Sequence, residues 1–379
     1  MIQLFTFHTT QPMFFKLFYD NDLAQASYLI GCQRSGNAIV VDPNMDIDTY
    51  VHAAEREKMR IAHVTETHIH ADFASGSRSL AQATGATLHV SDEGGTEWRY
   101  AFLHDDGVNA LHHGDRVSVG QVHLDVIHTP GHTPEHLTFL VTDSARSDVP
   151  LGALTGDFIF VGDVGRPDLL ERAAGQAGTM HAAAATLYRS IQRFKAQPDH
   201  LQIWPGQGAG SACGKALSAM TQSTLGYERV ANWALGSESE EAFVERVLEG
   251  QPTAPPYFGA MKLRNRDGET PHPVRLPRNL SPEQLRDVLQ SDDSIFVLDV
   301  RNLNEWQDGH LDRATLIPLP ELHDRLTELP HDRPVIVHCQ MGKRSVAAVA
   351  TLDAFGFQDI HALSGGFAAW QAAGLTTVK

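Results

Sequence analysis

The residues with the clearest chemical potential are two histidines and an aspartate spaced two apart, His68, His70 and Asp72. The β-branched run Ile61–Thr65 predicts a buried strand leading into them, and a helical pattern over Ser77–Ala83 follows. Side chains on the turn after a strand are fixed at one end and open to solvent at the other. Such a turn can direct imidazole and carboxylate groups to one metal ion, although a single triplet is equally expected in a plain polar turn.

Two further candidate ligands stand in the same position relative to a strand. His132 follows the alternating segment Val117–Ile127, and Asp157 ends the strand-like segment that begins at Ala153. Together with His68 they form a set of two imidazoles and one carboxylate, and we expect their three turns to converge on one metal. This set leaves coordination positions free, as in non-haem Fe(II) oxygenases. Catalytic zinc uses the same donors, so the ligand types alone do not identify the metal.

A second reactive group is Cys339, which follows the apolar run Val335–His338 and precedes a helix expected over Val346–Phe355. A loop between a strand and a helix directs backbone N–H groups inward, and the helix N-terminus adds positive potential. With the charges of Lys343 and Arg344, these groups would lower the pKa of a thiol and hold a thiolate, a persulfide or an anion. The alternative is a buried, inert cysteine.

The elements that must position these groups divide the chain into two α/β regions. Strands with interspersed helices, including one expected over His181–Phe194, fill the first 250 residues and suggest sheets covered by helices. Residues 250–278 contain six prolines, which exclude a continuous helix or central strand, so we expect the interdomain linker there. After the linker, Ser281 and Gln284 predict a capped helix start, and Ile295–Val300 is typical of a parallel strand buried on both faces.

Composition limits the classes of function. A chain of 379 residues with 42% hydrophobic and 20% charged residues fits two globular domains. Its net charge of −16 argues against a nucleic-acid partner, and no apolar run approaches the ~20 residues that span a membrane. The first twelve residues lack the pattern of a signal peptide, and three cysteines make no disulfide framework, so we expect a cytoplasmic protein.

The ordered motifs His-x-His-x-Asp, Thr-Pro-Gly-His and Thr-Gly-Asp, which contain His68, His132 and Asp157, resemble the metallo-β-lactamase fold. Within this fold, residues 13–250 are similar to the glyoxalase hydrolases and the persulfide dioxygenases. The resemblance implies an αββα sandwich. Because the persulfide dioxygenases are a mononuclear iron branch, it also implies one Fe(II) per chain on these three ligands. His70 and Asp72 would then orient the ligands or the bound oxygen species.

Two departures separate the chain from the two-metal hydrolases of this fold. Those enzymes carry a histidine after the motif aspartate, where this chain has Phe73. They carry another in a late Pro-Gly-His turn, where this chain has Gln207. Phenylalanine cannot ligate a metal and glutamine replaces imidazole poorly, so the second metal site lacks two ligands. A mononuclear site is therefore favoured over hydrolysis by a bridged hydroxide.

Four residues are candidates for contact with the substrate of this site. The turn Gly165–Asp168 matches the one that, in persulfide dioxygenases, places an arginine over a thiol substrate, which implies that Arg166, beside Asp168, clamps an anionic persulfide. Cys213 follows the Gln207 turn among small residues that allow close backbone approach, and Lys215 would favour a thiolate. Cys213 is either a structural thiol or a persulfide-carrying or substrate-gating cysteine near iron.

The pattern Cys-x-x-Gly-x-Arg, from Cys339 to Arg344, resembles the active loop of rhodaneses, which are sulfurtransferases. Four residues separate this cysteine and arginine, whereas tyrosine-phosphatase loops need five, so the loop suits a sulfur group better than a phosphate. The resemblance implies a small parallel-sheet α/β domain. It implies catalytic roles for Cys339, Lys343 and Arg344, and substrate binding by the rest of the loop, namely Gln340, Met341 and Gly342. Flanking family motifs are matched at Asp299–Arg301, Glu305–Trp306 and Gly365–Trp370.

These features predict a persulfide dioxygenase–rhodanese fusion. We expect a metallo-β-lactamase-fold domain at residues 13–250, a proline-rich linker at residues 251–279 and a rhodanese domain at residues 280–379. The implied reactants are a glutathione or coenzyme A persulfide, O2, sulfite and thiosulfate. The alternative is a zinc-dependent glyoxalase-type thioester hydrolase with a rhodanese-like binding module. The sequence leaves open the thiol carrier and whether the chain forms a homo-oligomer.

Overall fold

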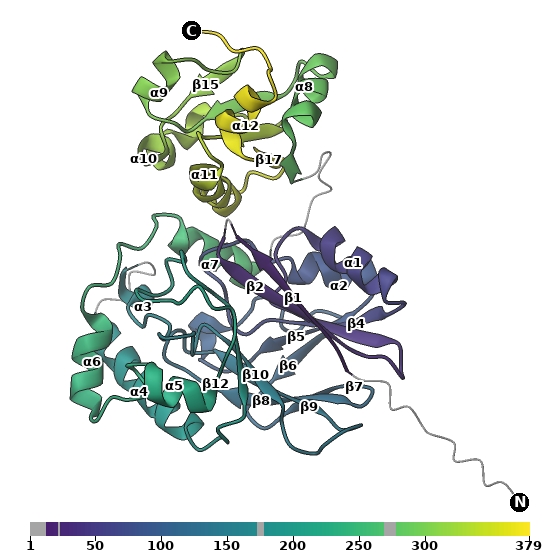
Figure 1. The fold of residues 1–379 in the computed structure, drawn as a ribbon, viewed down its shortest axis with the longest axis vertical. Coiled ribbons are helices and arrows are strands. Elements are labelled where there is room, and N and C mark those ends of the chain that lie inside the picture. Colours follow the sequence, from purple (N-terminus) through teal and green to yellow (C-terminus); the bar gives the residue numbers. More distant parts are fainter. Residues whose placement is uncertain (1–12, 22, 173–177, 269–277) are drawn as a thin grey trace, which may run out of the picture. The chain divides into compact units, whose positions relative to one another are not determined.

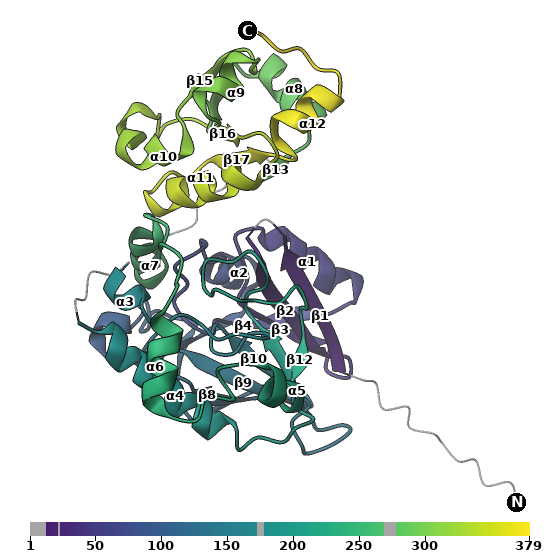
Figure 2. The same ribbon diagram turned by 60° about the vertical axis from the view of Figure 1, so that its left-hand side comes forward.

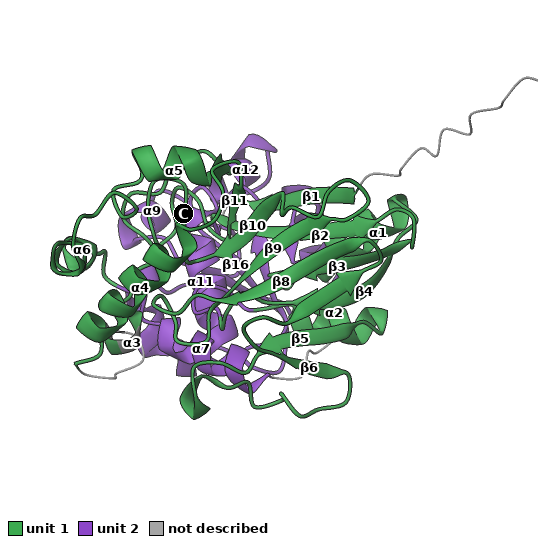
Figure 3. Ribbon diagram, turned by 90° about the horizontal axis from the view of Figure 1, so that it is seen from below, with its two compact units in different colours: residues 1–20, 24–69, 75–253 green, residues 21–23, 70–74, 254–379 purple. Residues whose placement is uncertain are grey.

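The computed structural model describes residues 13–21, 23–172, 178–268 and 278–379. By its internal contacts the chain forms two compact units, coloured separately in Figure 3. Of the described residues, the first unit contains 13–20, 24–69, 75–172 and 178–253, and the second contains 21, 23, 70–74, 254–268 and 278–379. The short segment 70–74 therefore groups with the second unit. Among the described residues, no helix is long and apolar enough to cross a membrane.

The first unit contains two six-stranded sheets. In the first sheet the strands follow one another in chain order. The first three pair antiparallel and the remaining pairs are parallel. These strands are β1 Met13–Asp20, β2 Gln25–Cys32, β3 Asn37–Val41, β4 Arg60–Thr65, β5 Thr87–Ser91 and β6 Val108–Leu111.

The second sheet has the order β12-β11-β10-β9-β8-β7. All its pairs are antiparallel except β10 with β11. Its strands are β7 Arg116–Val119, β8 Val122–His128, β9 Leu137–Asp143, β10 Gly152–Gly156, β11 Gln202–Pro205 and β12 Ser223–Thr224. A core that includes Tyr28 and Val41 from the first sheet and Leu124 and Phe139 from the second lies between the sheets.

Helices cover the outer face of each sheet, which gives four layers. Helices α1 and α2 lie beside the first sheet, and α4 and α6 lie beside the second (Figure 1). Leu80 of α2 and Ala54 of α1 pack on the first sheet, and Leu187 of α4 packs on the second with Phe243 of α6. The helix expected over His181–Phe194 is confirmed and begins one residue earlier. The helices of this unit are α1 Ile47–Arg56, α2 Ser77–Thr84, α3 Leu169–Arg172, α4 Met180–Phe194, α5 Leu225–Ala231 and α6 Glu240–Leu248.

The C-terminal part of the second unit is built on a five-stranded parallel sheet with the order β13-β17-β16-β14-β15. Its strands are β13 Asn279–Leu280, β14 Phe296–Asp299, β15 Ala314–Leu316, β16 Val335–His338 and β17 Ile360–Leu363. Helices α8 Pro282–Ser291, α9 Leu303–Gln307, α10 Leu319–Leu322, α11 Lys343–Ala354 and α12 Gly366–Ala372 surround it (Figure 2). The expected capping box at the start of α8 is confirmed: the Gln284 N–H donates to Ser281, and the Ser281 N–H donates to Gln284.

A short helix occupies part of the proline-rich stretch, in which we excluded only a continuous helix. Helix α7, Phe258–Asp267, forms because no proline falls between Pro256 and Pro271, and Gly268 ends it in the left-handed conformation with φ +69°. Its residues contact the segment 70–74 of the same unit. Asn265 donates to the backbone oxygens of His70 and Phe73 at 2.8 and 2.9 Å. A helix thus forms between Pro256 and the end of the described residues at Gly268, and the predicted linker over residues 251–279 stays a prediction.

Candidate metal centre and thiol site

The structure brings His68, His132 and Asp157 together. They lie after β4, between β8 and β9, and directly after β10, and all three are buried. Their candidate ligand atoms lie within 4.8 Å of one another. Asp157 Oδ2 is 4.0 Å from His68 Nε2 and 3.5 Å from His132 Nε2. These separations are too long for hydrogen bonds but suit ligands about 2.0–2.2 Å from a shared ion, so the donor set fits one divalent metal.

A hydrogen-bond chain fixes which nitrogen of His68 can bind the metal. Asp42 Oδ1 accepts the Thr67 N–H at 2.6 Å, and Asp42 Oδ2 accepts the Thr67 hydroxyl at 2.9 Å. The Thr67 oxygen is 3.0 Å from His68 Nδ1 and is left to accept its proton. His68 Nε2 is then unprotonated and can ligate. Asp42 adopts φ +52°, which is costly for a residue with a side chain and is typical of functional sites.

His132 is oriented by the loop that contains Arg166. His132 Nδ1 lies 2.9 Å from the backbone oxygen of Arg166. A carbonyl only accepts, so Nδ1 carries the proton and Nε2 keeps its lone pair for a metal. Gly165 makes this approach possible, because a Cβ there would lie 1.8 Å from the backbone oxygen of Asp157 and 3.0 Å from His132 Nδ1.

His136 is a further residue of this centre, and the sequence analysis missed it. It is fully buried, and its ring stacks on that of His68 with centroids 5.0 Å apart. Its Nε2 accepts the backbone N–H of Asp157 at 3.1 Å, and its Nδ1 lies 2.9 Å from the Thr129 hydroxyl. His136 therefore connects the loops that carry His132 and Asp157. Its place four residues after His132 was the only signal in the sequence.

Arg166 lies in a buried ion pair. Its Nε and Nη2 donate to the two carboxylate oxygens of Asp168, both at 2.8 Å, and Nη1 donates to the backbone oxygen of Ala212 at 3.1 Å. Both side chains of the pair have no exposed surface. The backbone N–H of Arg166 also donates to the oxygen of Cys213 at 3.1 Å. This arrangement holds the Cys213 segment, and contact of the guanidinium with a substrate would require the pair to open.

Cys213 and Lys215 occupy different environments. Cys213 is buried, with 2% of its surface exposed. The Lys215 ammonium donates to the backbone oxygen of Glu249 at 2.7 Å and to that of Arg246 at the end of α6. Burial lowers the pKa of Lys215 from its usual value. These contacts direct the lysine charge to the carbonyl end of a helix, a favourable place for a cation.

The predicted roles of His70 and Asp72 in orienting ligands stay predictions. Asp72 accepts a hydrogen bond on its backbone oxygen from the Tyr257 hydroxyl at 3.1 Å. The ring of His70 lies 4.4 Å from that of Phe73. Both residues thus belong to a local arrangement of the second unit, in which α7 contacts their backbone.

Cys339 lies in a tight loop between β16 and α11 and is 1% exposed. The backbone oxygens of Cys339 and Gln340 accept the N–H groups of Phe367 and Ala368 at 2.7 and 2.9 Å. This contact requires glycine at position 366, because a Cβ there would lie 2.5 Å from the oxygen of Cys339. Gly342, with φ +93°, allows the loop to turn into the helix. Of the other loop residues, Met341 and Lys343 are exposed.

Arg344 is held next to Cys339 by a carboxylate. Its two terminal nitrogens donate to the two oxygens of Glu305 at 2.7 and 2.6 Å. These hydrogen bonds lower the pKa of Glu305 to about 2 and raise the pKa of Arg344, to which the charge of Cys339 also contributes. The guanidinium therefore stays charged and fixed in direction.

A second buried ion pair contacts the Cys339 loop through Gln340. Arg301 makes a bidentate contact with Asp299, with donor distances of 2.7 to 3.0 Å, and its Nη1 donates to Gln340 at 3.1 Å. His338 is fully buried, and burial lowers its pKa to about 4, so it is neutral at physiological pH. Arg301 is therefore charged beside the loop, whereas the neighbouring His338 carries no charge.

Comparisons with known proteins agree with this architecture. The Metallo-beta-lactamase superfamily profile matches residues 20–206, and the Rhodanese-like domain profile matches residues 281–373. A solved structure of a metallo-beta-lactamase from Staphylococcus aureus is 36% identical, covers 94% of this chain and 100% of its own, and has a TM-score of 0.71. The chain therefore belongs to the metallo-beta-lactamase superfamily and carries a rhodanese-like domain on its C-terminal side, which confirms the predicted fold class.

More particular relatives point in two directions. The solved structure of ETHE1 from Myxococcus xanthus is 26% identical, covers 67% of this chain and 98% of its own, with a TM-score of 0.54. The mitochondrial persulfide dioxygenase ETHE1 of Bos taurus is 25% identical over 61% of this chain and 79% of its own. A hydroxyacylglutathione hydrolase of Rhodospirillum rubrum is 28% identical over 61% of this chain and 77% of its own. The chain is thus similar to both classes of enzyme named in these proteins.

Proposed function

We propose that the first unit is an Fe(II)-dependent persulfide dioxygenase and that the rhodanese-like domain is a sulfurtransferase. The observation that carries the first half is the set His68, His132 and Asp157. Among the described residues it is the only group of three or more histidine, cysteine, aspartate or glutamate side chains close enough to hold one metal ion. Two imidazoles with one carboxylate are the donors of mononuclear non-haem iron sites. Similarity to the bovine persulfide dioxygenase supports this choice.

The residue at position 207 supports a single metal. The turn before it approaches the carboxylate, because the Gly206 N–H donates to the backbone oxygen of Gly156 at 2.8 Å and a Cβ on Gly206 would lie 3.0 Å from Asp157 Oδ1. The next residue, Gln207, offers an amide where a second metal would need an imidazole. Phe73 removes the other expected ligand.

The proposed first reaction converts a thiol persulfide, O2 and water into the thiol and sulfite: RSSH + O2 + H2O gives RSH + H2SO3. An Fe(II) ion held by the three ligands would supply the site at which O2 and the persulfide sulfur react. The protein residues hold the ligands in position. Thr67 and the backbone of Arg166 fix the ligand tautomers, and His136 fixes the backbone of Asp157. The carrier thiol is proposed to be glutathione, coenzyme A or a similar small thiol.

The proposed second reaction moves one sulfur through Cys339. The thiolate attacks the outer sulfur of thiosulfate, the S–S bond breaks, and sulfite leaves: Cys–S⁻ + S2O3²⁻ gives Cys–S–S⁻ + SO3²⁻. Arg344 and Lys343 would stabilise these oxyanions, because charge-assisted hydrogen bonds are the strong ones. Arg344 keeps further N–H groups beyond the two that Glu305 accepts. The reverse reaction would make thiosulfate from sulfite and a Cys339 persulfide.

Metal analysis combined with oxygen consumption tests this proposal. Protein purified without added metal should contain about one iron per chain and consume O2 with glutathione or coenzyme A persulfide. Loss of iron and of O2 consumption in His132→Ala, with an unchanged far-UV circular dichroism spectrum, would support the ligand assignment. A protein that holds iron but does not consume O2 with any thiol persulfide would rule the dioxygenase out.

The second candidate is a zinc-dependent thioester hydrolase with a rhodanese-like binding module. The similarity to the hydroxyacylglutathione hydrolase favours it. It predicts about two zinc ions per chain and hydrolysis of S-acylglutathione, because these hydrolases use a metal-bridged hydroxide. Zinc near two and hydrolysis without O2 consumption would select this function.

A further inference from the structure

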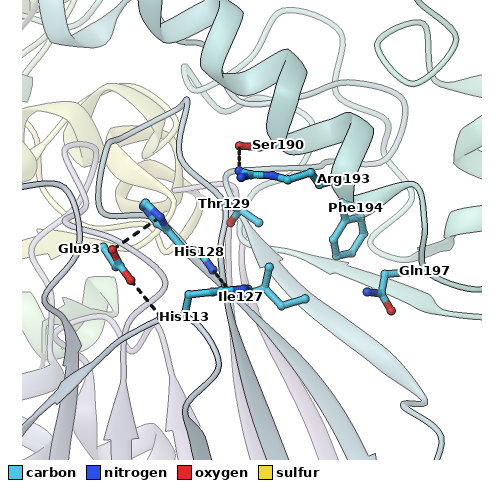
Figure 4. A pocket seen from close by; sticks show the side chains of 9 residues that line it. All are labelled: Glu93, His113, Ile127, His128, Thr129, Ser190, Arg193, Phe194 and Gln197. Atoms are coloured by element: carbon cyan, nitrogen blue, oxygen red, sulfur yellow. Dashed lines mark hydrogen bonds and ion pairs between the residues drawn. The ribbon is translucent and has the colours of Figure 1, made fainter.

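A pocket of about 420 Å³ opens in the first unit between the ends of β5 and β8 and the C-terminal half of α4 (Figure 4). None of its lining residues is a candidate metal ligand or part of the thiol loop, although the Thr129 hydroxyl lies 2.9 Å from His136 Nδ1. Its volume lies in the range of pockets for small molecules. The lining residues are Glu93, His113, Ile127, His128, Thr129, Ser190, Arg193, Phe194 and Gln197. We call this the α4 pocket.

One wall of the α4 pocket is acidic. Glu93 Oε1 accepts the backbone N–H of His113 at 3.0 Å, and Glu93 Oε2 lies 3.7 Å from His128 Nδ1. His128 Nε2 is 2.7 Å from the backbone oxygen of Pro134, and because a carbonyl only accepts, Nε2 donates there. The 3.7 Å between Glu93 Oε2 and His128 Nδ1 is too long for a hydrogen bond. The carboxylate therefore keeps lone pairs for a cationic group in the pocket.

The opposite wall carries a cation. Arg193 donates from Nη2 to the Ser190 hydroxyl at 3.2 Å, and Ser190 donates in turn to the backbone oxygen of Pro130 at 2.8 Å. Within the part of the chain that the structure describes, no carboxylate is paired with Arg193. Figure 4 places Arg193 and Glu93 on different sides of the pocket, with Thr129 between them. The remaining N–H groups of Arg193 suit a carboxylate, which can accept two of them.

The surface between these walls is mainly apolar. Phe194 is 3% exposed and belongs to the core under α4, and Ile127 packs against the same core. A second hollow of about 580 Å³, lined in part by His128, Arg193 and Gln192, adjoins the α4 pocket. The Gln192 Nε2 atom is buried and has no hydrogen-bond partner among the described residues.

We propose that the α4 pocket binds a small zwitterion whose ammonium and carboxylate groups lie at opposite ends of an apolar middle, as in a short peptide or an ω-amino acid. The carboxylate contacts Arg193, and the ammonium contacts Glu93. The apolar middle lies on Ile127 and Phe194. This binding site goes beyond the proposed dioxygenase and sulfurtransferase functions, and it requires neither.

Calorimetric titration of the full chain with the ω-amino acids from glycine to aminooctanoate tests the proposal. One chain length should bind best, because two fixed charges select one separation. Hexanoate and hexylammonium, which each keep a single charge, should bind at least about tenfold more weakly than aminohexanoate or its best-binding homologue. Failure of every chain length to bind, or equal binding of the singly charged analogues, would overturn the proposal.

Two variants assign the charges to the two walls. In Glu93→Gln the zwitterion should lose its advantage over hexanoate, and in Arg193→Gln it should lose its advantage over hexylammonium. The matched controls Glu55→Gln and Arg116→Gln remove the same charges from exposed positions outside the pocket and should bind like the wild type. Melting curves check that each variant is folded. Unchanged selectivity in both pocket variants would show that the zwitterion binds elsewhere.

Discussion

At the scale of single residues, Thr67 decides whether His68 can ligate. Its hydroxyl donates to Asp42 and therefore accepts the proton of His68 Nδ1, which leaves Nε2 unprotonated. In Thr67→Val this chain is broken, so we expect metal affinity to fall about 10–100-fold, the usual effect of removing such a partner. Competition with a chelator under anaerobic conditions measures the metal affinity and does not depend on catalytic activity.

Thr67→Ser is the matched control, because it keeps the hydroxyl and should keep most of the affinity. If Thr67→Val bound Fe(II) or Zn(II) as tightly as the wild type, the ring of His68 would be oriented without the threonine. Equal losses in both variants would point to packing of the threonine methyl group in place of its hydrogen bond.

At the scale of elements, the loop before His132 depends on close approach to α4. Gly131 has φ +145°, and a Cβ there would lie 2.4 Å from both Cα and Cβ of Leu187. Backbone atoms of a packed helix cannot move cheaply. Gly131→Ala should therefore destabilise the fold by about 1–3 kcal/mol through this overlap, in addition to about 1–2 kcal/mol for the strained backbone.

Gly107 provides the comparison, since it has φ +81° but a Cβ added there would have nothing within 4 Å. Gly107→Ala should cost only about 1–2 kcal/mol from the backbone conformation. Urea unfolding of both variants measures the difference. Similar losses in the two would mean that the β8–β9 loop can move away from α4.

The ion pair between α9 and α11 should make stability depend on pH. Arg344 lowers the pKa of Glu305 from 4.5 to about 2 in the folded protein. The stabilisation is therefore complete above the unfolded value of 4.5 and is lost as the pH falls from 4.5 towards about 2. Because the two side chains are 31% and 24% exposed, we expect a contribution of only about 1 kcal/mol.

Glu305→Gln tests this dependence. Its unfolding free energy should lie about 1 kcal/mol below that of the wild type near neutral pH and should approach it below about pH 3. A difference that stayed constant across this range would mean that the glutamate acts through its shape and neutral hydrogen bonds.

At the scale of the whole molecule, the sequence predicted the fold class because each motif stood at the end of a recognisable strand. The same rule found His68, His132 and Asp157, which lie far apart in the chain. It could not find Asp42 or His136. Their roles depend on contacts between separate loops, which spacing within one segment does not reveal.

Arg166 and α7 show a second limit of sequence reasoning. The predicted contact of Arg166 with a substrate stays a prediction, but the motif did not indicate that Asp168, two residues away, accepts Nε and Nη2 of its guanidinium in a buried pair. Helix α7 formed inside a proline-rich stretch because its ten residues contain no proline and bind the backbone of the segment 70–74. The proline content of a stretch predicts whether it can form long regular elements, but its contacts with the rest of the fold decide whether a short helix forms.

The presence of both sites in one chain leads to the final prediction, which rests on the proposed function. Sulfite from the first reaction is a nucleophile that can take the outer sulfur from a Cys339 persulfide: Cys–S–S⁻ + SO3²⁻ gives Cys–S⁻ + S2O3²⁻. A carrier persulfide would recharge Cys339 by transferring its own outer sulfur. Arg344, fixed by Glu305, would hold the dianion during this step.

We therefore expect Cys339→Ser to consume O2 with a supplied persulfide at the wild-type rate but to accumulate sulfite in place of thiosulfate. It should consume no O2 when thiosulfate and a thiol are the only sulfur sources. His68→Ala is the reciprocal variant, which should lose O2 consumption and retain thiosulfate cleavage at Cys339. Chromatography of sulfite and thiosulfate, corrected for the reaction without enzyme, distinguishes these outcomes. Enzymatic thiosulfate formation by Cys339→Ser would show that another group carries the sulfur, and loss of both activities in folded His68→Ala would show that the two sites do not act independently.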